Sequence, residues 1–194
     1  VAQCLDSMNL EMIVVGINHG GEQRIAELSP FSHPQHGGGA GAAYLTYLTQ
    51  NLKPYVDAHF RTLPEREHCY LGGSSLGGLI SLYGMLQYPE QFGGGLIFSP
   101  AYWFNPELKD IAQEFQPKKR TFVYHLVGDD EGGAPEEFVR DFKAMEASLL
   151  RQSAYWKLQS KTVNWFLLVA VVHDNARFFT IVPALRFGCF ITGN

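Results

Sequence analysis

The chain has 194 residues, 46% of them hydrophobic and 18% charged, which is typical of one globular domain with a large apolar core. Its formal net charge of -4 at pH 7 gives no reason to expect nucleic acid as a partner, and its one basic run, residues 118–120, has the length of a solvated loop. Three widely spaced cysteines indicate buried thiols rather than a disulfide framework or a metal site.

The sequence shows neither a membrane span nor a signal peptide. Its longest mostly apolar run, residues 163–172, has the length of a buried strand and not of a membrane helix. No basic segment followed by an apolar core stands near the N-terminus, so we expect a cytoplasmic protein. A periplasmic or secreted protein is the alternative if Val1 lies inside a longer chain. The oligomeric state stays open.

Segments with strand and helix character alternate along the chain. Apolar runs predict strands at residues 12–17, 69–71, 94–99, 121–127 and 163–172. Helical patterns cover residues 42–60, 76–88, 106–115, 135–150 and 176–187. Pro54 is expected to kink or divide the first of these helices, and Pro89 to end the second. This alternation predicts an α/β protein with a parallel sheet.

Residues 18–41 form a polar segment that is long for a structureless connection, which indicates either a functional loop or an unrecognised element. We expect Arg24 and Glu27 to form an ion pair that holds this loop, with a substrate contact of Arg24 as the alternative. His33 and His36 suggest a metal site, but no carboxylate or cysteine stands near them in the sequence. We therefore expect no metal.

The main motif lies in residues 69–85, where Gly73, Ser75 and Gly77 match the G-x-S-x-G pattern of a sharp turn between a strand and a helix. Such a turn exposes a serine hydroxyl, so Ser75 is the candidate nucleophile. Ser74 fits less well because the shifted pattern would need a glycine at Leu76. An apolar strand before the turn and a broadly apolar helix after it supply the context that the motif requires.

The turn also predicts half of an oxyanion hole. The amide of Leu76 would lie at the start of the helix, where unpaired N–H groups and the helix dipole stabilise negative charge. The alternative is a glycine-rich turn whose serine has no chemical role.

A serine nucleophile needs a base, and the base needs an orienting acid. The strand predicted at 121–127 is followed by three carboxylates, Asp129, Asp130 and Glu131, and the strand at 163–172 is followed by His173. Because the carboxyl ends of parallel strands meet at one edge of the sheet, these groups are expected near Ser75. The order serine, acid, histidine is that of α/β hydrolases. The alternatives are that His173 is a surface histidine without a chemical role, and that the three carboxylates form a loop at the start of a helix, where the helix dipole favours them.

The sequence resembles the putative-esterase family of α/β hydrolases, which includes enterochelin esterases, S-formylglutathione hydrolases, feruloyl esterases and mycolyltransferases. It is most similar to the bacterial enterochelin-esterase-like branch. The resemblance is dense from about residue 10 to 105 and thinner afterwards. The stretches that carry it are residues 14–18, Arg24 with Glu27 and Pro30, and residues 52–55, 72–78, 88–90, 92–93 and 98–101.

The resemblance implies an α/β-hydrolase fold and a role for each position that matches the family's motifs. The family's nucleophile falls on Ser75, its acid on Glu131 and its histidine on His173, with Asp129 and Asp130 as alternatives for the acid. The loop around Trp103 resembles the family's substrate-side loop. We therefore expect Trp103 on the pocket wall, with a place in the core as the alternative.

The sequence also departs from the family. Members have further strands before the one at residues 12–17, and the loop after one of them supplies the second oxyanion amide. We therefore expect a single domain, residues 1–194, that lacks the N-terminal strands of a complete α/β hydrolase. Loss of one oxyanion donor costs about 2.7 to 4 kcal/mol of transition-state stabilisation. We therefore expect this chain alone to be weakly active or inactive.

Together these features predict a serine hydrolase that cleaves a small-molecule carboxylic ester through an acyl-enzyme, without a metal or organic cofactor. Ser75, Glu131 and His173 would form the triad, and Leu76 would supply the oxyanion amide. Acyl transfer or thioester cleavage on the same triad is one alternative. A binding domain that keeps the fold without activity is another.

Overall fold

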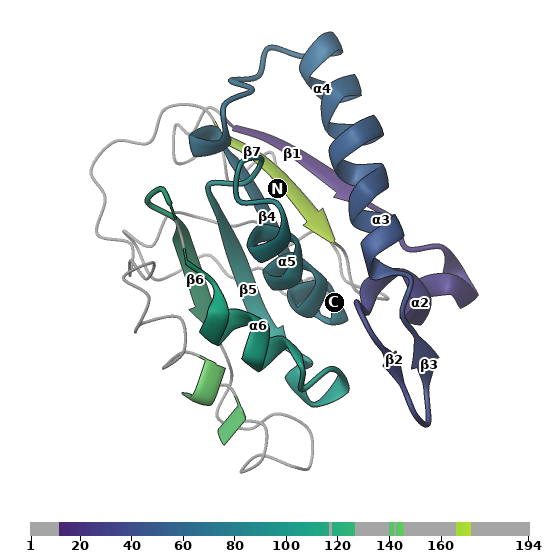
Figure 1. The fold of residues 1–194 in the computed structure, drawn as a ribbon. Coiled ribbons are helices and arrows are strands. Elements are labelled where there is room, and N and C mark those ends of the chain that lie inside the picture. Colours follow the sequence, from purple (N-terminus) through teal and green to yellow (C-terminus); the bar gives the residue numbers. More distant parts are fainter. Residues whose placement is uncertain (1–11, 117, 127–139, 142, 146–165, 172–194) are drawn as a thin grey trace.

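The structure is a computed structural model that describes residues 12–116, 118–126, 140–141, 143–145 and 166–171. A five-stranded parallel sheet forms its centre, in the order β1-β7-β4-β5-β6 (Figure 1). These strands are β1 (Met12–Ile17), β4 (Cys69–Ser75), β5 (Gly94–Pro100), β6 (Phe122–Leu126) and β7 (Phe166–Val171). The parallel pairing confirms the expected α/β class.

Helices cover the sheet, with α5 and α6 lying across one face and α3 and α4 running together beside β1 (Figure 1). The α-helices are α2 (Arg24–Leu28), α3 (Gly41–Tyr47), α4 (Lys53–His59), α5 (Leu76–Gln87) and α6 (Leu108–Glu114). The described residues also form three short 3-10 helices, η1 (Gly21–Gln23), η3 (Arg66–His68) and η4 (Tyr102–Phe104), and one π-helical segment, η2 (Leu48–Leu52). In this part of the chain no helix has the length and apolar character needed to cross a bilayer.

The helix predicted at residues 42–60 is confirmed and is divided as expected. It consists of α3, the π-helical η2 and α4, and Pro54 lies in the first turn of α4. Just before the proline, the amide of Lys53 donates to the carbonyl of Leu48, five residues back. Because proline has no N–H, the wider π turn lets the helix continue past a missing hydrogen bond.

The polar segment at residues 18–41 contains more structure than its sequence indicates. It holds η1, α2 and a hairpin of two-residue strands, β2 (Ser32–His33) and β3 (Gly37–Gly38). Elements this short show no hydrophobic periodicity, so the sequence could not reveal them. The buried Ser29 joins them, since its hydroxyl donates to the Ile25 carbonyl and accepts from the Gly39 amide.

Helix α5 forms the centre of the core. Ten of its twelve residues are buried, including Leu79, Ile80, Leu82 and Met85 at 0% exposure. The helix ends at Gln87, two residues before Pro89, as predicted. Such complete burial fixes the start of the helix relative to the strands on which it packs.

Some predicted features lie outside the described residues. The predicted helix at 176–187 and the cysteines Cys4 and Cys189 are among them. Of the helix predicted at 135–150, residues 140–141 and 143–145 are described and helical. Cys69 is described and fully buried, and its burial raises the pKa of its thiol to about 12.

Candidate active site

Ser75 stands at the sharp turn that the sequence predicts. It is the last residue of β4 and directly precedes α5, and its backbone has φ 56° and ψ -123°. A side chain at positive φ is strained, and such strain is common at catalytic sites. The half-buried Ser75 thus lies at the carboxyl end of a central strand, where α/β proteins place their reactive groups.

The flanking glycines are required by close backbone packing. A Cβ atom at Gly73 would lie 2.6 Å from the carbonyl carbon and oxygen of Gly77, which is too close for any side chain. A Cβ atom at Gly78 would lie 3.0 Å from the Phe98 carbonyl oxygen and 3.1 Å from that of Gly73. The glycines therefore let the first turn of α5 approach the ends of β4 and β5.

Leu76 is the first residue of α5, and its side chain is buried in the core. The first amides of a helix have no partner within the helix and carry the positive end of its dipole. Burial of the Leu76 side chain holds its backbone at the turn beside Ser75. This arrangement fits an oxyanion donor.

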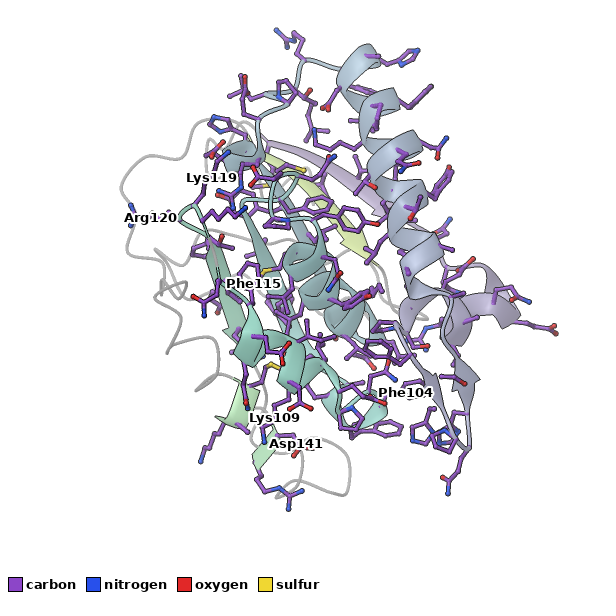
Figure 2. All side chains as sticks on the ribbon, viewed as in Figure 1. Phe104, Lys109, Phe115, Lys119, Arg120 and Asp141 are labelled. Atoms are coloured by element: carbon purple, nitrogen blue, oxygen red, sulfur yellow. The ribbon has the colours of Figure 1, made fainter. Side chains whose placement is uncertain are left out.

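Four aromatic rings, contributed by His33, His36, Trp103 and Phe104, meet where the β2–β3 hairpin approaches η4; we call this group the aromatic corner. The imidazoles of His33 and His36 stack with centroids 4.7 Å apart, and Phe104 lies 4.9 Å from His33. The Trp103 ring stands nearly perpendicular to both imidazoles, at 5.9 and 6.0 Å. Figure 2 places Phe104 beside the hairpin, beyond the carboxyl end of β5.

Trp103 is 51% exposed, so the alternative that it belongs to the core is wrong. Its neighbours Tyr102 and Phe104 are buried instead. The hydroxyl of Tyr102 lies 2.7 Å from Nε2 of His125 on β6, and burial lowers the pKa of His125 to about 3. A neutral imidazole therefore anchors one end of η4 while Trp103 faces outward.

The expected ion pair between Arg24 and Glu27 is not among the ion pairs of the described residues. The Glu27 carboxylate instead accepts a hydrogen bond from the Gly20 amide at 2.8 Å. A Cβ atom at Gly20 would lie 2.5 Å from a Glu27 oxygen, so a larger residue there would require the Glu27 carboxylate to shift. Glu27 therefore holds the loop after β1 through the backbone amide of Gly20.

The other two members of the predicted triad, Glu131 and His173, lie outside the described residues, as do Asp129 and Asp130. The strands that precede them are described. Val171 at the end of β7 pairs with Gly73 of β4, and Leu126 at the end of β6 pairs with Phe98 of β5. Among the described histidines, none makes a hydrogen bond to the Ser75 hydroxyl.

The structural parts of this site carry no motif in the sequence. The sequence suggests only a metal site for His33 and His36, and it gives no signal at His125. No local signal could have revealed the aromatic corner, because residues 39–101 separate the hairpin from η4. Such contacts depend on the fold and not on a motif.

Comparison with known proteins places these features in a family. A family model described as "Putative esterase" matches residues 2–164. Two proteins of Bacillus subtilis (strain 168), called "Uncharacterized protein YbbA" and "Uncharacterized protein YjcH", are 27% identical over 136 residues and 26% identical over 119 residues. These matches cover 67% and 61% of this chain, and 54% and 47% of the relatives. The chain thus spans about half the length of the curated relatives that it matches.

Solved structures show the same fold at low sequence identity. The BES protein from Bacillus cereus has a TM-score of 0.58 and 22% identity, and the match covers 80% of this chain and 56% of that one. An IroE-like serine hydrolase from Shewanella oneidensis has a TM-score of 0.57 and 15% identity, with 79% and 51% covered. The enterobactin esterase FES from Shigella flexneri, in the presence of 2,3-di-hydroxy-N-benzoyl-glycine, has a TM-score of 0.52 and 22% identity, with 69% and 34% covered. The chain therefore has an α/β-hydrolase fold, and because the family model matches most of its length, it belongs to the putative esterase family.

Proposed function

We propose that this chain cleaves a carboxylic ester with Ser75 as the nucleophile. His173 takes the hydroxyl proton as Ser75 attacks the ester carbonyl, and Glu131 orients the imidazole and stabilises its protonated form. The Leu76 amide donates to the oxyanion. The protonated histidine then protonates the leaving alcohol, and a water molecule deprotonated by the histidine releases the acid.

The observation that carries the proposal is the backbone of Ser75, a strained residue between a central strand and a buried helix. A turn without chemical use would be expected to hold glycine at a positive φ, not serine. Here Gly73 packs closely against the Gly77 backbone, and the serine between them is the last residue of β4, at the carboxyl edge of the sheet. This arrangement is the one that a serine hydrolase needs.

Sheet order supports His173 as the base. Val171, whose Cα pairs with that of Gly73, precedes His173 by two residues, and two residues of chain span at most about 7 Å. Ser75 also follows Gly73 by two residues. Strands β4 and β7 therefore end side by side, which supports the proposal that the histidine reaches the serine.

Glu131 follows β6, a strand that is not adjacent to β4. It follows Leu126 by five residues, a reach of about 17 Å, and β5 lies between β6 and β4. Asp129 and Asp130 have a shorter reach from the same strand. Separate substitutions of the three carboxylates would identify the acid.

The aromatic corner supports an aryl group on the substrate. Trp103 follows Pro100, the register partner of Ser75, by three residues, or at most about 10 Å of chain. Exposed rings beside a nucleophile can hold a planar group by stacking. The Shigella flexneri esterase was solved with a benzoyl compound, which agrees with such a group. Arg24, half-buried at the start of α2, remains a second proposed substrate contact.

A fluorophosphonate probe tests the proposal. We expect stoichiometric labelling that is lost in Ser75→Ala and kept in Ser74→Ala, the matched neighbour. His173→Ala should slow labelling strongly. A folded wild-type chain that does not react would support the silent binding domain instead. Trp103→Ala should raise KM for ethyl benzoate more than for ethyl acetate, and an equal change for both esters would argue against the aryl site.

A further inference from the structure

Two residues other than glycine have positive φ in the described part of the chain, Ser75 at 56° and Ser99 at 40°. Side chains other than those of asparagine, aspartate and histidine rarely adopt this region. Ser99 also precedes Pro100, and a following proline disfavours helical backbone conformations. Ser99 is therefore held in its conformation by its surroundings, at a position where its own preference is extended.

Ser99 lies on the strand next to the nucleophile, at the same edge of the sheet. In the register of β4 and β5, Ser74 pairs with Phe98, and the next pair is Ser75 with Pro100. Ser99 is the extra residue between them, so it forms a β-bulge directly opposite the turn. Bulges beside active sites re-aim the residues around them.

The bulge creates a contact to the nucleophile itself. The amide of Ala101 donates to the Ser75 carbonyl oxygen with an N···O distance of 3.1 Å. Without the extra residue, the residue after Phe98 would pair with Ser75 in place of Pro100. The side chains of the following residues would then point to the opposite face of the sheet. The positive φ at Ser99 thus brings the Ala101 amide to the backbone of Ser75.

The bulge also supports the helix that follows the nucleophile. A Cβ atom at Gly78 would lie 3.0 Å from the Phe98 carbonyl oxygen and 3.2 Å from the Pro100 Cβ. These two atoms flank Ser99 on either side. The first turn of α5, which carries the Leu76 amide, therefore rests directly on the bulged end of β5.

From these contacts we infer that Ser99 is a positioning residue for the reaction at Ser75. Its backbone conformation sets the end of β5, which fixes both the Ser75 carbonyl and the start of α5. We assign the effect to the backbone of Ser99, and the substitutions below separate it from an effect of the hydroxyl. This inference rests on the proposed role of Ser75 as nucleophile.

A series of substitutions at one position separates the backbone from the hydroxyl. Ser99→Gly and Ser99→Ala remove the hydroxyl and tolerate the positive φ better than a branched side chain. Ser99→Thr keeps the hydroxyl, and Ser99→Val has the same shape without it, but both are β-branched and strongly disfavour this backbone. The measurements are the rate constant for fluorophosphonate labelling of Ser75, kcat and KM for ethyl acetate, and hydrogen exchange of the Ala101 amide.

We expect Gly and Ala at position 99 to label at least as fast as wild type. Thr and Val should both label more slowly, by up to about 100-fold, because a displacement of about 1 Å at a catalytic group has an effect of this size. The loss should fall on kcat with KM unchanged, and the Ala101 amide should lose protection while the amides of β4 keep theirs.

Other results would overturn the inference. If Ala and Gly label slowly while Thr labels normally, the hydroxyl and not the backbone is responsible. If all four variants label like wild type, Ser99 has no positioning role although the proposed function stands. If the Thr and Val variants do not fold, slow labelling of the Gly variant still contradicts the inference. Failure of the folded wild type to label would reject both the inference and the proposed function.

Discussion

The Asn105 side chain holds the backbone of Phe31, which lies 74 residues earlier in the chain. Its amide nitrogen donates to the Phe31 carbonyl at 3.0 Å, and its oxygen accepts from the Phe31 amide at 3.3 Å. Asn105 directly follows η4, and Phe31 directly precedes β2. One buried side chain thus fixes the two segments that form the aromatic corner relative to each other.

Replacement of Asn105 by alanine should therefore affect both stability and the proposed substrate site. The variant leaves the polar backbone groups of Phe31, and the Phe104 carbonyl that also accepts from Asn105, without this partner. At about 1 kcal/mol for each lost hydrogen bond, we expect a loss of about 2 to 3 kcal/mol in the free energy of unfolding. Urea denaturation measures this loss.

The exposed Asn51 provides the control, since Asn51→Ala should change the free energy of unfolding by less than about 0.5 kcal/mol. If the aromatic corner binds an aryl group, Asn105→Ala should also raise KM for ethyl benzoate relative to ethyl acetate. Equal KM ratios in wild type and Asn105→Ala would show that the hydrogen bonds from Asn105 to Phe31 do not affect substrate binding.

His125 makes stability depend on pH. Its pKa falls from about 6.5 in the unfolded chain to about 3 in the folded one, because burial disfavours the charged imidazole. Between these values the unfolded chain binds a proton that the folded chain does not, so stability falls as pH drops from about 6.5 toward 3. We expect His125 alone to contribute a loss of a few kcal/mol between pH 7 and pH 4.

His125→Gln tests this contribution, because the amide can still hydrogen-bond to the Tyr102 hydroxyl but does not titrate. Urea denaturation at several pH values should give a flatter pH dependence for the variant than for wild type. Parallel curves for the two proteins would show that other groups cause the acid sensitivity.

Arg66 is a buried cation whose hydrogen bonds join three separate segments. Its guanidinium donates to the carbonyls of Pro89, Phe92 and Arg120 and to the Thr121 hydroxyl. Lysine cannot reproduce this planar set of donors. Arg66→Lys should therefore lower the free energy of unfolding by about 2 to 4 kcal/mol, because buried carbonyls lose their partners.

The matched control is Arg61→Lys at an exposed position, where a change below about 0.5 kcal/mol is expected. Thermal or urea denaturation compares the two variants. Similar stabilities of both variants would mean that water or other groups replace the lost donors at Arg66.

Gly73→Ala should disturb the turn at Ser75. The new methyl group would lie 2.6 Å from the Gly77 carbonyl, so β4 and α5 must move apart. We expect a loss of about 1 to 3 kcal/mol in stability and slower fluorophosphonate labelling. Gly21→Ala is the comparison, because Gly21 has a positive φ but no atom within 4 Å of the added Cβ. Normal labelling of Gly73→Ala would show that the turn tolerates the displacement.

Local patterns predicted the local parts of the structure. The bounds of β1 follow from a continuous apolar run, and the turn at Ser75 follows from glycines at fixed spacing. The aromatic corner and the hydrogen bonds from Asn105 to Phe31 could not be predicted. Their residues lie in short segments that show no hydrophobic periodicity and are far apart in the sequence. The bulge at Ser99 was also hidden, since positive φ is usually marked by glycine and here the residue is serine.

The position of β7 has a consequence for how the chain folds during synthesis. Residues 166–171 lie between β1 and β4, so these early strands share no hydrogen bonds with each other. A nascent chain that has emerged only as far as β6 leaves one open edge on β1 and another on β4, both able to pair with foreign strands. We therefore expect chains stalled on the ribosome before residue 166 to be protease-sensitive and to need a chaperone, and protection to appear only once this late strand has left the exit tunnel.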